Sequence, residues 1–198
     1  MIDRPNEHGA ADHGADERST GDHHVDNRQS GNHQSGESSS GSGSQAVDSF
    51  TFAMGDFTAE FPIELHYATN HMWARSVGGQ RFQFGLTAYA VRLLQDVYFL
   101  DWICDPPTEI PLRGHIGSIE SKKAESDLYA PIAGTLISVN DATLSDPSLI
   151  NADAYRDGWL IEIKADVSPK LLSPEQYAEH LVNAWEVAQR TIKGQANL

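Results

Sequence analysis

The sequence predicts a mainly β domain with flanking helices: a small barrel or sandwich with a C-terminal helix, preceded by a disordered tail. Three observations support this fold class. Short apolar runs with turn signals between them recur from Trp73 to Lys164, which is typical of small barrels and sandwiches. Residues 173–193 have helical periodicity. Residues 1–49 contain no aromatic side chain.

Residues 1–49 are expected to form a disordered low-complexity tail. The first 48 residues hold eight Ser, seven Gly and five of the nine His, and nine acidic against three basic residues give them a charge of −6. Such a segment cannot bury enough apolar surface to offset its backbone entropy. Its histidines could hold a divalent metal loosely, but no fixed ligand spacing supports a site. We therefore expect no metal centre.

Residues 50–198 have the length and composition of one folded domain. Its first expected strands are Trp73–Val77 and Arg81–Phe84, which Gly78-Gly79 joins as a hairpin turn. The second strand alternates polar and apolar residues, so one of its faces should be buried. Thr87 can then cap a short helix at Ala88–Leu94.

The remaining strands follow at short intervals. Asp96–Trp102 is a dense apolar run, and the prolines after it, Asp105-Pro-Pro107 and Pro111, predict a loop. Further strands are expected at His115–Glu120, Asp127–Ala130, Thr135–Val139 and Trp159–Lys164.

The C-terminal helix is expected over residues 173–193. Ser173 can serve as N-cap, Pro174 suits the first helical position, and Gln176 stands at the capping-box position. Tyr177 begins an apolar face at helical spacing, which we expect to pack on the barrel rather than to bind a partner. Gly194 is expected to end the helix.

Composition excludes several classes of function. The net charge of −14 argues against nucleic acid or an anionic membrane as a partner, because both need a basic surface. No apolar run reaches the roughly 18 residues of a membrane span. The single cysteine, Cys104, suggests a reducing compartment, so we expect a cytoplasmic protein.

The familiar catalytic constellations are missing from the sequence. It contains no G-x-S-x-G, no glycine-rich phosphate loop and no C-x-x-C. Cys104 follows an apolar run and is expected to be a small buried residue rather than a nucleophile. We therefore predict no catalytic residues, and a carrier or binding role rather than an enzyme.

Two adjacent lysines stand out within residues 117–131. Lys122 and Lys123 occupy a tight turn between two strand-like segments, flanked by Glu120, Glu125 and Asp127. A lysine at the apex of a hairpin projects its amine into solvent, which suits a covalently attached group that must visit several active sites. An ordinary solvated charged turn is the alternative, and composition alone favours it.

The order of motifs resembles the glycine cleavage system H protein family. Glu120-Ser-Lys-Lys-Ala124 stands where that family has E-S-V-K-A, and Tyr67, His71 and Trp73 fit its Y-x-x-x-H-x-W-x-R. The resemblance extends over residues 62–177 and implies a lipoyl-domain-like barrel-sandwich hybrid. Further similar segments follow in the family order at Gly85–Ala90, Ser126–Pro131, Gly134, Leu149–Asn151 and Asp157–Ile161.

The resemblance implies that Lys123 carries lipoate in an amide bond and that Glu120 is presented to the lipoate-attaching enzyme. The implied function is a monomeric lipoyl carrier that shuttles an aminomethyl group. The implied partners are a pyridoxal-phosphate glycine decarboxylase, a folate-dependent aminomethyltransferase and a dihydrolipoyl dehydrogenase, which reoxidises the carrier, besides the lipoate-attaching enzyme.

Several positions depart from the family pattern. Ala88 and Gln95 replace a common Asp and Gly, and Lys122 replaces a small apolar residue. The choice of acceptor between Lys122 and Lys123 therefore stays open. Two alternative functions also stay open: an H-like lipoate carrier for another pathway, such as sulfur oxidation or lipoate relay, and an unlipoylated scaffold protein.

Overall fold

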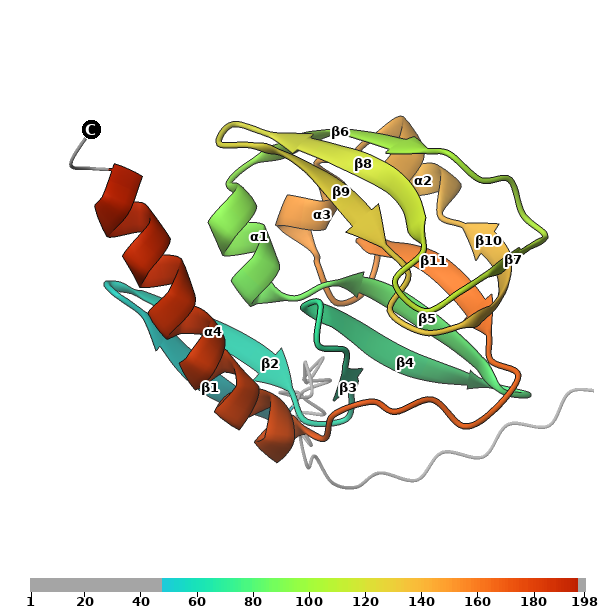
Figure 1. Cartoon of the computed structure of the whole chain (residues 1–198), viewed down its shortest axis with the longest axis horizontal. Coiled ribbons are helices and arrows are strands. Elements are labelled where there is room, and N and C mark those ends of the chain that lie inside the picture. The colour runs from blue at the N-terminus through green and yellow to red at the C-terminus, as the bar shows by residue number, and fades with distance from the viewer. Residues whose placement is uncertain (1–47, 196–198) are drawn as a thin grey trace, which may run out of the picture. The chain divides into compact units, whose positions relative to one another are not determined.

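The computed structural model describes the backbone of residues 48–195 and the side chains of residues 48–190. The expected tail lies outside the described residues up to position 47. The described chain forms three antiparallel sheets with flanking helices, one of them C-terminal (Figure 1). The predicted fold class is confirmed.

The chain begins with a run of strands and one short helix. Their bounds are β1 (Ser49–Met54), β2 (Phe57–Pro62), β3 (His66–Tyr67), β4 (Met72–Gly78), β5 (Arg81–Leu86), α1 (Ala88–Leu94), β6 (Val97–Trp102) and β7 (Thr108–Ile110). The elements that follow are β8 (His115–Ser121), β9 (Glu125–Tyr129), β10 (Gly134–Val139), α2 (Asp141–Ser145), α3 (Leu149–Ala152), β11 (Trp159–Lys164) and α4 (Pro174–Gln195).

The main core lies between two of the sheets. The larger sheet has the strand order β3-β4-β5-β11-β10-β7, and the smaller one has the order β6-β8-β9. Phe84 and Ile161 of the larger sheet join Leu100 and Ile119 of the smaller one in a single buried apolar cluster. Burial of this cluster stabilises the contact between the two sheets. This arrangement agrees with the expected barrel-sandwich hybrid.

Most predicted elements are confirmed to within two residues at either end. The helix α1 begins after Thr87, whose Oγ1 accepts the N–H of Ala90 at 3.4 Å. The capping box of α4 is also present, because Ser173 Oγ accepts the N–H of Gln176 at 3.3 Å and Gln176 Oε1 accepts the N–H of Ser173 at 3.0 Å. Local side-chain chemistry therefore sets the start of both helices.

Two sequence predictions are wrong. The proline-rich loop after β6 contains the strand β7, which pairs with β10 through Glu109 and Thr135. Pro107 and Pro111 flank this strand rather than interrupt it, so no ladder hydrogen bond is lost. Gly194 does not end α4, because the helix continues to Gln195.

A second apolar cluster joins α4 to the β1–β2 hairpin, an element that the sequence reading did not predict (Figure 1). The Tyr67 and Tyr177 rings are stacked with centroids 4.3 Å apart, and Phe61 meets Tyr177 edge-on at 5.7 Å. The apolar face of α4 therefore packs on this hairpin as well as on β3 at the edge of the larger sheet. The expected packing on the barrel is only part of the contact.

His71 lies at the contact between α4 and the larger sheet. Its Nδ1 is 3.0 Å from the Tyr177 hydroxyl, which is 3.1 Å from Thr87 Oγ1. Burial, assisted by the nearby His180, lowers the pKa of His71 from 6.5 to about 4. The imidazole is therefore neutral in the folded protein at pH 7.

This shift makes stability depend on pH. Between about pH 6.5 and pH 4 the unfolded chain binds a proton at His71 that the folded chain does not, so the free energy of unfolding should fall by on the order of 3 kcal/mol across that window. His71→Asn removes the titration and suits the left-handed backbone at this position (φ 64°). Urea unfolding at pH 7 and pH 4.5 should show a smaller loss of stability in this variant than in the wild type.

The exposed His66, changed to Asn, is the control and should keep the wild-type loss of stability between the two pH values. Equal pH dependence in His71→Asn and the wild type would contradict the assignment.

Gly134 is required by a close approach of backbone segments. Its φ is 147°, and a Cβ added there would overlap the carbonyl oxygen of Lys164 on the paired strand. Gly134→Ala should lower the free energy of unfolding by roughly 2–4 kcal/mol, because strain and overlap add. Gly79→Ala is the matched control, since Gly79 also has a positive φ but has no atom within 4 Å of an added Cβ. Gly79→Ala should lower the free energy of unfolding by about 1–2 kcal/mol. Chemical denaturation compares the two, and equal losses would refute the steric explanation.

Candidate functional site

The turn between β8 and β9 consists of the exposed residues 122–124, called the lysine turn below. The buried Ser121 closes it. The Ser121 N–H and Oγ–H both donate to the carbonyl of Ala124 at 3.0 Å. The same Oγ accepts the N–H groups of Lys123 at 3.4 Å and Ala124 at 3.2 Å. One side chain thus bonds three backbone groups of the turn, which favours a single shape.

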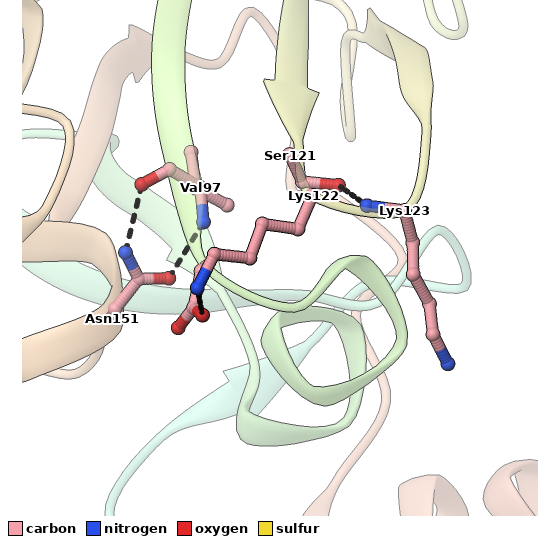
Figure 2. Close-up of polar contacts among 6 residues, drawn as sticks. Val97, Ser121, Lys122, Lys123 and Asn151 are labelled. Atoms are coloured by element: carbon pink, nitrogen blue, oxygen red, sulfur yellow. Dashed lines mark hydrogen bonds and ion pairs between the residues drawn. The ribbon is translucent and has the colours of Figure 1, made fainter.

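A second element holds the lysine turn from outside. The residues Gln95 and Asp96, called the corner below, connect α1 to β6. The Lys122 N–H donates to the Gln95 carbonyl at 3.1 Å. Lys122 Nζ pairs with Asp96 Oδ2 at 2.5 Å, and a dashed line marks this ion pair in Figure 2. Both corner residues have positive φ values, 57° for Gln95 and 47° for Asp96.

Asn151 holds the strand that leaves the corner. Its Oδ1 accepts the Val97 N–H at 3.0 Å, and its Nδ2 donates to the Val97 carbonyl at 2.8 Å (Figure 2). Val97 is also the strand partner of Ser121. The start of β6, the end of β8 and α3 are therefore linked at one place. The sequence reading gave Asn151 no role, because its partner lies 54 residues away.

The two adjacent lysines are in different environments. The Lys122 side chain extends toward the corner, whereas the Lys123 side chain points away from it (Figure 2). Within residues 48–190, no hydrogen bond or ion pair engages the Lys123 ammonium. The lysine turn therefore presents one occupied and one unoccupied amine.

A groove of about 460 Å³ borders the lysine turn. This volume lies within the range of roughly 300–1,000 Å³ that is usual for small-molecule sites. Its walls come from the β1–β2 hairpin, from α1 and from α4. The lining residues are Met54, Arg92, Leu93, Gln95, Lys123, Ala124 and Trp185. A group attached to Lys123 therefore has apolar surface beside it.

Glu120 lies on β8 at the base of the lysine turn. The resemblance implies that this residue is presented to the lipoate-attaching enzyme. Glu120 faces Phe99 on β6 and Glu125 on β9, and its Oε2 accepts the Tyr98 hydroxyl at 3.3 Å. The structure thus brings Glu120 and Lys123 to the same end of the β8–β9 hairpin.

Cys104 is the other candidate that the sequence singled out. It is half-buried, and burial together with Asp105 raises the pKa of its thiol. Its sulfur lies 3.5 Å from the carbonyl of Ile116. A thiol with a raised pKa forms little thiolate, so this environment does not favour a nucleophile.

The described part of the chain contains neither a metal cluster nor a membrane-spanning helix. Between residues 48 and 190, no group of three or more His, Cys, Asp or Glu side chains could hold a metal ion. The helices found there are too short or too polar to cross a membrane. The five tail histidines, His8, His13, His23, His24 and His33, lie outside the described residues.

Comparisons with known proteins show which family the chain resembles. Residues 65–188 match the family model described as "Glycine cleavage H-protein". The chain is 40% identical over 112 residues to the glycine cleavage system H protein of Photorhabdus laumondii, covering 57% of this chain and 85% of the relative. It is 38% identical over 125 residues to the probable glycine cleavage system H protein of Haloarcula marismortui. This match covers 62% of this chain and 97% of the relative.

The fold is also similar to that of a solved structure. The crystal structure of a glycine cleavage system H protein from Mycobacterium marinum superimposes with a TM-score of 0.55 at 29% identity. The match covers 60% of this chain and 97% of that one. The β1–β2 hairpin precedes residue 65 and so lies outside the family match.

Proposed function

The chain belongs to the glycine cleavage H-protein family, whose members are lipoyl carriers rather than enzymes, and from that premise we propose that it carries lipoate on Lys123. As a cytoplasmic, monomeric carrier it shuttles an aminomethyl group from a pyridoxal-phosphate glycine decarboxylase to a folate-dependent aminomethyltransferase. A dihydrolipoyl dehydrogenase then reoxidises it.

One observation carries this proposal: the unoccupied amine of Lys123 at the apex of an immobilised turn. A carrier must reach into several active sites while its attachment point stays in place. The four hydrogen bonds of Ser121 within the turn favour a fixed backbone. The flexible lysine side chain, without a partner among the described residues, supplies the movement.

The surroundings of Lys123 fit a lipoyl group. Bound lipoyl supplies a ring disulfide that accepts a transferred group and two electrons. Met54, Leu93 and Trp185 offer apolar groove surface against which the lipoyl chain can rest between visits. Arg92 and Gln95 add polar groups at the groove, so it is not uniformly apolar.

The acidic side chains near the turn support docking of basic partner surfaces. Glu120 and Glu125 are opposite each other on β8 and β9, and Asp127 follows on the same outward face. Exposed carboxylates of this kind steer association, and salt screens their effect. We propose that Glu120 also faces the lipoate-attaching enzyme.

Substitution of the acceptor tests the proposal. Full-length protein produced in cells supplied with lipoate should gain the mass of one lipoyl group, and Lys123→Arg should gain none, because a guanidinium does not form the amide. The lipoylated wild type should also support glycine–bicarbonate exchange by the decarboxylase, whereas Lys123→Arg should support none above background. Intact mass spectrometry and the exchange assay measure the two effects. Lys164→Arg, at an exposed lysine on β11, is the control and should behave as the wild type.

The outcomes separate the alternative functions. A wild type without any lipoyl increment refutes the carrier and leaves a scaffold. A lipoylated wild type that supports no exchange assigns the carrier to another lipoyl-dependent pathway. The departures at Lys122 and Gln95, both next to the acceptor, are the observations that favour this second function.

A further inference from the structure

We propose that Lys122 is a positioning residue, whose attachment to the corner fixes the lysine turn and leaves Lys123 as the single amine available for acylation. This inference rests on the proposed function, since it concerns how the lipoyl acceptor is selected. It assigns a role to the residue at which the chain departs from the E-S-V-K-A pattern.

The geometry provides two attachments from one residue to the corner. The Lys122 N–H donates to Gln95, and its ammonium pairs with Asp96. Because these bonds join the backbone and the side chain of Lys122 to adjacent residues, the turn cannot rotate about the strand direction without breaking one of them. A valine at this position could make the backbone bond but not the ion pair.

The corner is itself a firm support. The Gln95 N–H donates to the Val91 carbonyl at 2.9 Å and so ends α1, and Asn151 holds Val97 on the other side. Positive φ values at two successive residues other than glycine persist only where the surroundings fix them. The lysine turn is therefore tied to a segment that has little freedom of its own.

The chemistry of acylation distinguishes the two amines. A neutral amine nitrogen adds to the carbonyl carbon of an activated lipoyl donor, an acyl adenylate, and the C–N bond forms. The bond from that carbon to the phosphate oxygen breaks, AMP leaves with the electron pair, and a proton passes from nitrogen to solvent. Lys122 must first leave Asp96, whereas the Lys123 side chain points away from this ion pair (Figure 2).

A double-mutant cycle on the full-length apo-protein tests this role, with lipoate, ATP and a purified lipoate ligase. Asp96→Asn removes the charge while keeping a residue that suits φ 47°, and Lys122→Met keeps the length of the chain without its charge. Each should slow the initial rate of lipoylation roughly two- to fivefold, because exposed ion pairs contribute up to about 1 kcal/mol and 1.4 kcal/mol is tenfold. The double variant should be no slower than either single variant.

Two further variants separate positioning from general damage. Lys122→Arg keeps the ion pair and should retain the wild-type rate. Asp101→Asn removes another exposed carboxylate of β6 and should also leave the rate unchanged. Timed intact-mass measurements give the rates, and peptide mapping of the wild type should locate the lipoyl group on Lys123 alone.

Three results would overturn the inference: an unchanged rate in Asp96→Asn, additive losses in the double variant, or lipoyl on Lys122 in the wild type. These results are distinct from failure of the proposed function. If the wild type accepts no lipoyl group, the carrier proposal itself falls. If the wild type is lipoylated and Asp96→Asn is lipoylated at the same initial rate, only the proposed role of Lys122 is refuted.

Discussion

The attachment of the lysine turn to the corner between α1 and β6 is the constraint on which the site depends. A hairpin tip has few neighbours, and its backbone amides have no ladder partners. Here Ser121 satisfies the turn from within, and Gln95 and Asp96 hold it from outside. The result is a fixed backbone at a position where hairpins commonly move.

That constraint is built from segments that lie far apart in the sequence. Asp96 and Lys122 are separated by 26 residues, and Asn151 reaches Val97 across 54. The pairing of β6 with β8 brings the first two segments together, and α3 adds the third. The groove beside the turn likewise combines the β1–β2 hairpin with α4, from opposite ends of the described chain. The family fold thus supplies the turn, and this chain adds a wall that precedes the family match.

Local signals made much of the fold predictable. Thr87 and Ser173 cap their helices through hydrogen bonds to residues three positions away, so sequence spacing alone located both. The alternation in Arg81–Phe84 identified a strand for the same reason. The β7 strand could not be predicted from the sequence, because it has only three residues and depends on pairing with β10. Phe50 and Phe52 alternate along β1, but the packing that stabilises this hairpin against α4 is not local.

The candidate site could likewise be predicted only in part from the sequence. The resemblance singled out Lys123 and Glu120, which lie at the same end of the β8–β9 hairpin, but it left the choice between two adjacent lysines open. That choice depends on Asp96, which no local pattern connects to Lys122. Asn151 lies in one of the family-like segments, but it was given no role because a surface asparagine carries no signal of its backbone partner. The sequence therefore suggested a chemistry for the site but not the contacts that hold the lysine turn in place.

The central claim, a fixed turn with one free lysine, is tested most directly by NMR relaxation of the unmodified protein. Backbone order parameters of residues 121–124 should be near 0.85, about the value of rigid strands, and the Lys122 side chain should be more restricted than that of Lys123. Backbone values below about 0.6, or equal mobility of the two lysine side chains, would contradict the account.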